Sequence, residues 1–310
     1  MVQSNLAFVF PGQGSQKIGM LADLAAEYPV VQETFAEASD VLGYDLWDLL
    51  QNGEQDAINM TERTQPLLLT ASVACWRVFS ANKEIRPALM AGHSLGEWSA
   101  LVCAEVLAFK DAVRLVQQRG KFMQEAVPAG EGAMAAIIGL DDEAIKAACE
   151  EASADGVASA VNFNSPGQVV IAGSKAAIDR AIELCKEAGA KRAMPLPVSA
   201  PFHTELMRPA AERLAEQIEA TPFQAPATPV VHNVHAQTET DPAKIKALMI
   251  EQIYSPVLWV DCVKAMKEAG VEQAVECGPG KVLAGLVKRI DKSISSQGLE
   301  TAADVEALSV

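Results

Sequence analysis

Several features that mark familiar classes of protein are missing from this 310-residue sequence. The six cysteines form no CxxC pair and the four histidines no HExxH motif, so we expect neither a metal ion nor another cofactor. The cysteines are expected to be reduced core residues. No apolar run approaches the roughly 18 residues of a membrane span, and the first residues show no basic region followed by a long apolar one. We therefore expect a cytoplasmic protein without a membrane partner.

Positive charge is also scarce, because 25 basic residues stand against 40 acidic ones and leave a net charge of −15. Nucleic-acid binding is not expected, since neutralising phosphates requires a basic face. Any anionic ligand must instead meet a local positive charge. The apolar fraction of 50% is enough to form a substantial core.

The first 126 residues alternate between short apolar runs and helical patterns. Residues 6–10 have the length of a strand and end at the glycine loop "PGQG". Helical patterns are expected at residues 30–42, 66–82, 95–107 and 110–126, with Pro66 in the first turn of the second helix. This alternation predicts a mainly parallel α/β layer.

A different pattern follows the proline- and glycine-rich joint "VPAGEG" that begins at residue 127. Strands and helices in the order βαββαβ are expected at residues 132–139, 141–153, 157–164, 168–172, 174–189 and 191–198. This order is that of the ferredoxin-like unit. We predict a small ferredoxin-like domain at 127–199 inserted into a larger domain formed by residues 1–126 and 200–310. The last twenty residues are polar and weakly patterned, and no element is assigned to them.

A possible nucleophile lies in "AGHSLGEWSA", where Ser94 stands between Gly92 and Gly96. Glycine-any-serine-any-glycine is the pattern of a nucleophile elbow, a sharp strand-to-helix turn that exposes the serine hydroxyl. A chain of this length shows the pattern by chance roughly one time in ten. An apolar run before it and a helical pattern after it match the setting of an elbow. The alternative is a structural turn.

A serine hydroxyl needs a base within hydrogen-bonding reach, and His203 is the strongest candidate. It lies in "SAPFHTELM", where the inserted domain rejoins the larger one, although a histidine there is also compatible with a helix cap or a surface position. His93 is expected to pack at the elbow. His232 and His235 are expected to be surface or packing residues.

The loop around Gln13 does not match a nucleotide-binding motif. A dinucleotide fingerprint would require glycine at Lys17, and a phosphate-binding loop would require lysine at Met20. A backbone amide from this loop is instead suited to an oxyanion hole together with the amide of Leu95.

Arg119 lies in the helical pattern "VRLVQQRGKFM", among apolar neighbours that would desolvate it. Most arginines are solvated surface charges. In a chain this acidic, however, a buried guanidinium could hold an anionic substrate, because it forms two parallel hydrogen bonds to a carboxylate.

Six stretches together resemble the malonyl-CoA:acyl carrier protein transacylases, the malonyltransferases of bacterial fatty acid synthesis, which are related to the acyltransferase domains of polyketide synthases. They occur in the family's order between about residues 5 and 290: "FPGQGSQ", "GHSLGEWSAL", "QRGKFMQ", "FNSPGQVVIAG", "SAPFHTELM" and "ECGPGKVL". The resemblance implies an α/β-hydrolase-like large domain interrupted by the small ferredoxin-like domain.

The resemblance also implies a role for each matched residue. Ser94 would carry the acyl group, His203 would be its base, and Arg119 would pair with the malonyl carboxylate. Gln13 and Leu95 would donate backbone amides to the oxyanion. Gln252 would orient His203 in place of a triad acid, a departure from ordinary hydrolases.

Phe202 would restrict the space available to an α-methyl group on the substrate, and ordinary packing at a helix start is its alternative role. The expected substrates are malonyl-CoA and the phosphopantetheine thiol of acyl carrier protein, with no cofactor, and the expected state is a monomer. Candidates for carrier docking are Lys281, Lys288 and Arg289, together with Lys191 and Arg192 of the small domain, and their alternative role is that of solvated surface charges.

Three other functions remain open from the sequence. A serine esterase or thioesterase, or a free-standing acyltransferase of a polyketide pathway, would share the elbow. A scaffold that binds acyl carrier protein without catalysis would need a degenerate site.

Overall fold

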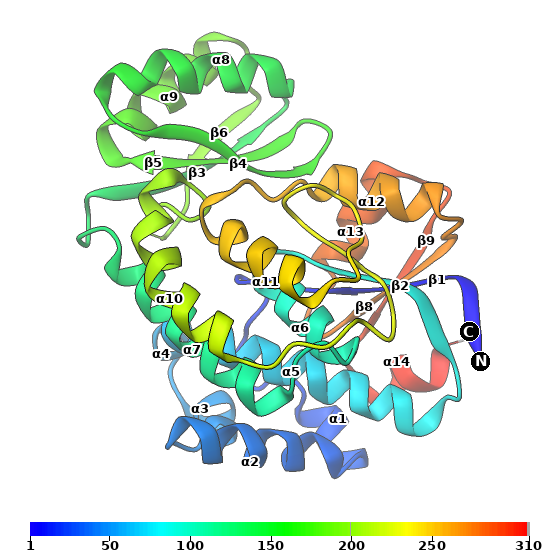
Figure 1. Cartoon of the computed structure of the whole chain (residues 1–310). Coiled ribbons are helices and arrows are strands. Elements are labelled where there is room, and N and C mark those ends of the chain that lie inside the picture. Colours follow the sequence, from blue (N-terminus) through cyan, green and yellow to red (C-terminus); the bar gives the residue numbers. More distant parts are fainter. Residues whose placement is uncertain (199, 309–310) are drawn as a thin grey trace.

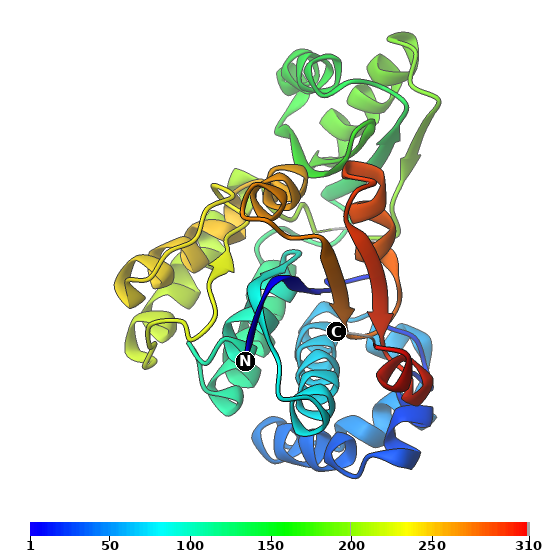
Figure 2. The same ribbon diagram turned by 90° about the vertical axis from the view of Figure 1, so that its right-hand side faces the viewer.

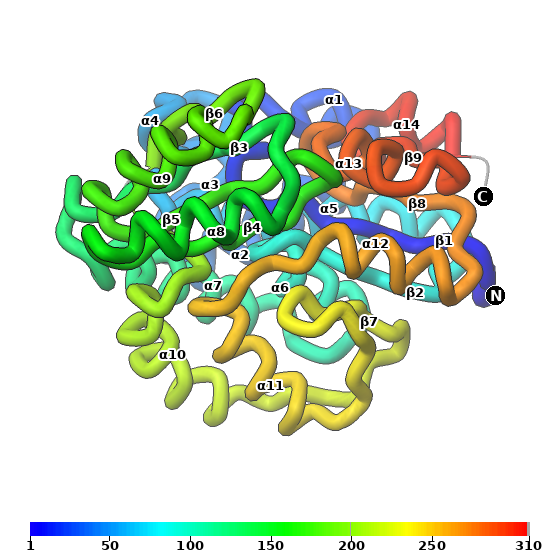
Figure 3. The backbone as a smooth tube through the Cα atoms, turned by 90° about the horizontal axis from the view of Figure 1, so that it is seen from above, coloured from blue at the N-terminus to red at the C-terminus, as the bar shows by residue number. Residues whose placement is uncertain are grey.

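The computed structural model describes residues 1–198 and 200–308, and it confirms the predicted mixed α/β class. A five-stranded parallel sheet has the strand order β7-β2-β1-β8-β9 (Figures 1 and 3). These strands are β1 (Val2–Phe10), β2 (Arg86–Gly92), β7 (Val230–Val231), β8 (Gln273–Cys277) and β9 (Ser295–Leu299).

Strand β1 lies at the centre of this sheet, and its second half is fully buried. Alternate residues point to opposite faces, so Phe8 and Phe10 enter one apolar cluster while Ala7 and Val9 enter another. The register aligns Phe10 with Gly92 at the end of β2. The loops that follow β1 and β2 therefore leave the sheet side by side, at the edge where ligands bind in open parallel sheets.

Helices cover both faces of the large sheet (Figures 1 and 2). The cluster on one face includes residues of α2, α5, α6, α7 and α10, and the cluster on the other face includes residues of α12 and α13. The helices of this part of the chain are α1 (Ala22–Glu27), α2 (Val30–Leu42), α3 (Leu46–Asn52), α4 (Gln55–Ile58), α5 (Thr61–Asn82), α6 (Leu95–Cys103), α7 (Phe109–Glu125), α10 (Arg208–Ala220), α11 (Pro242–Glu251), α12 (Trp259–Glu268), α13 (Val282–Ile290) and α14 (Ala302–Ala307).

Two sequence-based assignments are wrong in this region. Helix α5 begins at Thr61, so Pro66 lies inside the helix and not in its first turn. The five residues of α5 that precede Pro66 are all polar, so they show no apolar period although their backbone is helical. The polar tail, in which no element was expected, contains β9 and α14. Strand β9 is held by backbone pairing with β8, and its sequence SSQGL lacks the alternation of apolar residues that predicts a strand.

The second sheet is antiparallel and has the order β4-β5-β3-β6. Its strands and helices follow one another as β3 (Gly132–Ile138), α8 (Asp142–Ala152), β4 (Ala158–Ser165), β5 (Gln168–Ser174), α9 (Lys175–Glu187) and β6 (Arg192–Pro195). Helices α8 and α9 pack on one face of this sheet around an apolar cluster of their own. The ends of the two predicted domains at residues 199 and 310 lie outside the described residues.

The opposite face of the small sheet turns toward the large sheet (Figure 2). It carries a small apolar cluster that includes Met134 and Val161 and packs against Phe202. The backbone of Val257, just before α12, bonds to β4 through its N–H to the Val161 oxygen at 2.7 Å and through its oxygen from the Phe163 N–H at 3.1 Å. The small sheet is therefore joined to the segment before α12 by main-chain hydrogen bonds as well as by apolar contacts.

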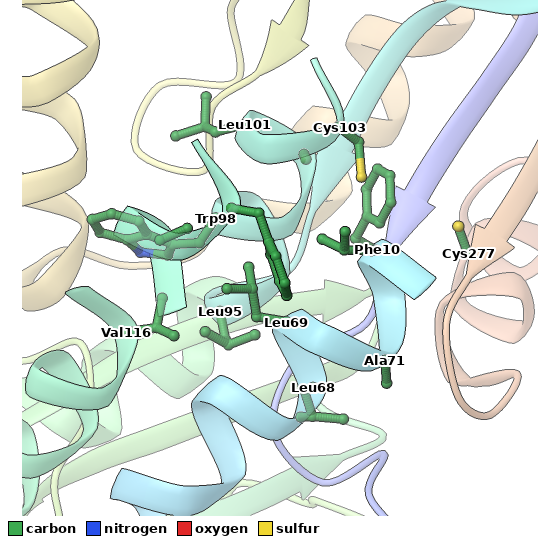
Figure 4. Packing of buried hydrophobic residues seen from close by; sticks show 14 of the residues in the cluster. Phe10, Leu68, Leu69, Ala71, Leu95, Trp98, Leu101, Cys103, Val116 and Cys277 are labelled. Carbon is green, nitrogen blue, oxygen red and sulfur yellow. The ribbon is translucent and has the colours of Figure 1, made fainter. Parts of the chain in front are cut away.

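The turn from β2 to α6 is packed too tightly for any side chain at its glycines. A Cβ atom on Gly92 would lie 2.0 Å from Gly96, and one on Gly96 would lie 2.0 Å from the Phe10 oxygen. Below the turn, Leu95, Trp98 and Leu101 of α6 enter the core (Figure 4). The turn is thus held by backbone contact with β1 and by the apolar face of α6.

We expect Gly96→Ala to lower the free energy of unfolding by at least about 2 kcal/mol, because the added methyl meets fixed backbone atoms. Denaturant titration of both proteins measures this difference. Gly285→Ala is the matched control, since its Cβ would meet nothing within 4 Å in α13. The control should raise stability by up to about 1 kcal/mol through helix propensity. Equal effects of the two substitutions would contradict this account of the turn.

Candidate active site

Ser94 occupies the turn between β2 and α6 in a conformation that is unusual for a residue other than glycine. Its φ of 52° and ψ of −109° lie outside the regions that L-residues commonly adopt. The backbone N–H of Ser94 donates to Asn233 Oδ1 at 2.8 Å, and this contact helps to hold the strained turn. The side chain lies in a cavity at the end of the large sheet.

His203 lies within hydrogen-bonding distance of Ser94, with 2.7 Å between Ser94 Oγ and His203 Nε2. The other ring nitrogen, Nδ1, lies 2.9 Å from the backbone oxygen of Gln252. A carbonyl oxygen can only accept a hydrogen bond, so Nδ1 carries the ring proton and Nε2 is free to accept from the serine hydroxyl. This is the tautomer that a general base requires.

The imidazole of His203 is buried, with 3% of its residue surface exposed. Burial, together with the positive charge of Arg119, lowers the pKa of His203 from 6.5 to about 3. Both causes disfavour the charged ring. At neutral pH His203 is therefore uncharged and able to take a proton.

Arg119 of α7 brings a positive charge into the same cavity although only 1% of its surface is exposed. Its guanidinium donates to Gln65 Oε1 at 2.7 Å, to Gln252 Oε1 at 3.1 Å and to Ser94 Oγ at 3.2 Å. Burial lowers its pKa to about 10, so the group stays charged at neutral pH. No carboxylate contacts it among residues 1–198 and 200–308.

Gln252 contacts His203 through its backbone oxygen, and its side chain has other partners. The side-chain nitrogen donates to the backbone oxygen of Ser94 at 2.9 Å and to Glu97 Oε2 at 2.8 Å, while the side-chain oxygen accepts from Arg119. One residue thus touches the serine turn, the imidazole and the guanidinium.

The remaining residues expected at the site line a cavity of about 140 Å³ beside Ser94. Gln13 enters it from the loop after β1. Leu95 is the first residue of α6, so its amide has no partner within the helix. Phe202 stands on the side toward the small sheet. The full lining is Gln13, Gln65, His93, Ser94, Leu95, Arg119, Met123, Met134, Asn162, Leu196, Val198, Phe202 and His203.

Several residues of the site were not expected from the sequence. Gln65 of α5 holds Arg119, and Asn164 of β4 lies 2.7 Å from His93 Nε2 through its side-chain oxygen. His232 is fully buried and lies 2.6 Å from Glu97, so a surface position for it is wrong, whereas His235 is exposed. The signal that could have drawn attention to Glu97 is its acidic charge within the apolar pattern that follows Ser94.

Two further properties are relevant to the chemistry of the site. Within the part of the chain that the structure describes, no three His, Cys, Asp or Glu side chains form a group able to hold a metal ion. In that same part, no helix combines the length and the apolar character needed to cross a membrane.

Comparison with known proteins gives consistent matches over nearly the whole chain. Residues 7–307 match the model of the acyl transferase domain. The malonyl CoA-acyl carrier protein transacylase of Salmonella typhimurium is 59% identical over 304 residues, covering 98% of each chain.

Solved structures agree with these matches. The acyl carrier protein S-malonyltransferase from Vibrio cholerae is 59% identical, with a TM-score of 0.97, and the match covers 98% of this chain and all of the other. A malonyl-transacylase solved in complex with its type II polyketide synthase acyl-carrier protein is 56% identical, with a TM-score of 0.97 and 98% coverage of both chains.

The environment of His203 leads to a prediction about its titration. Because burial and Arg119 both lower its pKa, the ring should remain uncharged as the pH falls through 6.5 and become protonated only near about 3. NMR titration of ring-labelled histidine measures this directly. Arg119→Met removes the positive charge beside His203 and should therefore raise the pKa of His203. A wild-type pKa near 6.5 would contradict the described burial.

Proposed function

This chain belongs to the family of acyl transferase domains, and from that membership we propose that it transfers malonyl groups from malonyl-CoA to acyl carrier protein. The product is the extender unit of fatty acid biosynthesis. The observation that carries this proposal is the charged guanidinium of Arg119, 3.2 Å from Ser94 Oγ in a cavity otherwise suited to an uncharged acyl group. A carboxylate at the far end of the acyl group would meet this charge in bidentate geometry.

In the first half-reaction Ser94 is the nucleophile. As Oγ bonds to the thioester carbon of malonyl-CoA, its proton passes to His203 Nε2, 2.7 Å away. The carbonyl oxygen becomes an oxyanion that accepts from the amides of Gln13 and Leu95. The carbon–sulfur bond then breaks, coenzyme A takes the proton from His203 and leaves as a thiol, and the malonyl group remains on Ser94 as an ester.

In the second half-reaction the phosphopantetheine thiol of acyl carrier protein enters the same cavity. It gives its proton to His203 and attacks the malonyl-serine ester, and the earlier steps run in reverse. Each half exchanges a thioester and an ester without a change of oxidation state. The reaction therefore balances without a cofactor.

Binding of the malonyl carboxylate would also change the base. The charge of Arg119 is one of the causes that lower the pKa of His203. A carboxylate paired with Arg119 offsets this charge, so the imidazolium that forms during attack becomes less unfavourable. A malonyl donor thus raises the basicity of His203, whereas an acetyl donor does not.

The lining of the cavity supports selection for an unbranched malonyl group, because Phe202 lies in its wall together with Ser94 and His203. We assign to Phe202 the steric exclusion of an α-methyl substituent. One methyl is worth about 1–3 kcal/mol in such discrimination.

We also propose a fold for each part of the chain. The strand order β4-β5-β3-β6 and the sequence of elements support a ferredoxin-like small domain at 127–199. The parallel sheet with a serine turn after β2 supports an α/β-hydrolase-like large domain at 1–126 and 200–310. One chain supplies every residue of the site, which supports a monomer, and the enzyme is assigned to the cytoplasm.

Mass spectrometry of the intact protein mixed with malonyl-CoA tests the proposal. We expect a stable malonyl adduct on the wild-type chain, its disappearance on adding phosphopantetheinylated acyl carrier protein, and none on Ser94→Ala. Rapid release of free malonate without an adduct would indicate a hydrolase. No adduct and no malonate would indicate a carrier-binding protein without catalysis.

Substitution of Arg119 tests the assignment of the carboxylate site. Arg119→Ala should lower kcat/KM for malonyl transfer by about a hundredfold or more, the cost of removing a charged hydrogen-bonding partner. It should keep or raise the low rate of acetyl transfer. Steady-state rates with both acyl-CoA donors measure the two values, and an equal loss with both would contradict the role of Arg119.

A further inference from the structure

Glu97 is a buried carboxylate on α6, three residues after Ser94, and 1% of its surface is exposed. An ionised carboxylate inside a protein is costly unless hydrogen-bond donors satisfy its oxygens. Glu97 takes part in none of the proposed steps of acyl transfer. A buried carboxylate in the first turn of the helix that follows the nucleophile requires an explanation.

Both carboxylate oxygens of Glu97 have partners. Oε1 lies 2.6 Å from His232 Nδ1, which carries the proton there because a carboxylate only accepts. Oε2 accepts from Gln252 Nε2 at 2.8 Å and from the Asn233 backbone N–H at 3.2 Å. The charge is thus compensated by donors from two segments that are distant in sequence.

Two of these partners continue directly to the reacting groups. The side-chain nitrogen of Gln252 donates both to Glu97 and to the backbone oxygen of Ser94. These two hydrogen bonds leave the side-chain oxygen of Gln252 facing Arg119. Asn233 accepts from the Ser94 N–H at 2.8 Å and donates to the Gly92 oxygen at 2.7 Å. One carboxylate therefore lies behind both the serine turn and the guanidinium.

The contacts also define the orientation of the Gln252 amide. If its nitrogen and oxygen exchanged places, the oxygen would face Glu97 and the nitrogen would face Arg119, pairing acceptor with acceptor and donor with donor. Because Oε2 of Glu97 accepts from Gln252 and from the Asn233 N–H, it allows only the observed orientation. Its charge also favours the charged form of Arg119, which lies within electrostatic reach but does not contact it.

We propose that Glu97 is a positioning residue for acyl selection, because through the Gln252 amide it holds the Arg119 guanidinium toward the acyl group on Ser94. This inference rests on the proposed malonyl transfer. Glu97 itself does not contact the substrate. A positioning role predicts that substitution of Glu97 changes the preference between acyl donors, whereas a role in stability alone does not.

The test compares the rate of Ser94 acylation by malonyl-CoA and by acetyl-CoA in single-turnover reactions. Glu97→Ala should lower the malonyl-to-acetyl ratio of kcat/KM by roughly tenfold or more, because misplacement of a positioned group by a small distance is costly. Glu97→Gln should keep the ratio within about threefold of wild type, since its oxygen can still accept from Gln252. The amide nitrogen of the new glutamine can donate to Nδ1 of His232 if the ring proton of His232 moves to Nε2. That nitrogen has no hydrogen-bond partner in the described part of the chain.

A double-mutant cycle with Arg119→Ala isolates the path of the effect. In the Arg119→Ala background, Glu97→Ala should change the donor ratio by less than about twofold, because the group that it positions is gone. If Glu97→Ala does not fold, Glu97→Asp replaces it, since the shorter side chain cannot reach both sets of partners. We expect the ratio to fall there too.

Glu276→Ala is the matched control, as Glu276 is a fully buried carboxylate of β8 that bonds to the Ala284 N–H of α13. It should lower stability and leave the donor ratio unchanged. Equal loss with both donors in the Glu97 variants, or full additivity in the cycle, would overturn the inference. Failure of the proposed function is distinguishable, because wild type would then show no preference for malonyl-CoA and Arg119→Ala would not alter it.

Discussion

The rest of the site depends on one constraint, a guanidinium held charged and nearly inaccessible to water beside the serine. The protein surrounds Arg119 with the amide oxygens of Gln65 and Gln252, which compensate it without neutralising it. Burial and the charge of Arg119 together lower the pKa of His203 and keep it in the form of a free base. A carboxylate in contact with Arg119 would stabilise the free enzyme and compete with a malonyl substrate. Amide ligands avoid that competition.

The same constraint bears on the group behind His203, which in the described part of the chain is a backbone oxygen and not a carboxylate. In many serine hydrolases a carboxylate fixes the base and stabilises its charged form. Here a backbone oxygen of Gln252 fixes the ring, and the buried carboxylate Glu97 lies on the far side of the amide. The base is oriented without being made strongly basic, which suits a reaction between esters and thioesters, both of which are reactive acyl donors.

Much of this arrangement could be predicted from the sequence, because Ser94, His203 and Arg119 lie in local motifs whose order is informative. The residues that support them have no such signal. Gln65 is a polar residue within a helical stretch, and Asn233 follows a two-residue strand, so only the tertiary fold brings them to the site. Placing Pro66 in the first turn set the predicted start of α5 too late in the chain. Strand β9 could not be predicted because it depends on pairing with β8.

The cavity has walls of separate origin, and this separation affects how the family can diversify. Its charged wall belongs to the large sheet and its helices, whereas Met134, Leu196 and Val198 belong to the small sheet and the segment after it. Apolar side chains on the second wall make no hydrogen bonds to the reacting groups. Substitutions there can reshape the space for an acyl group while the proton transfers continue unchanged, so specificity and catalysis are free to evolve separately.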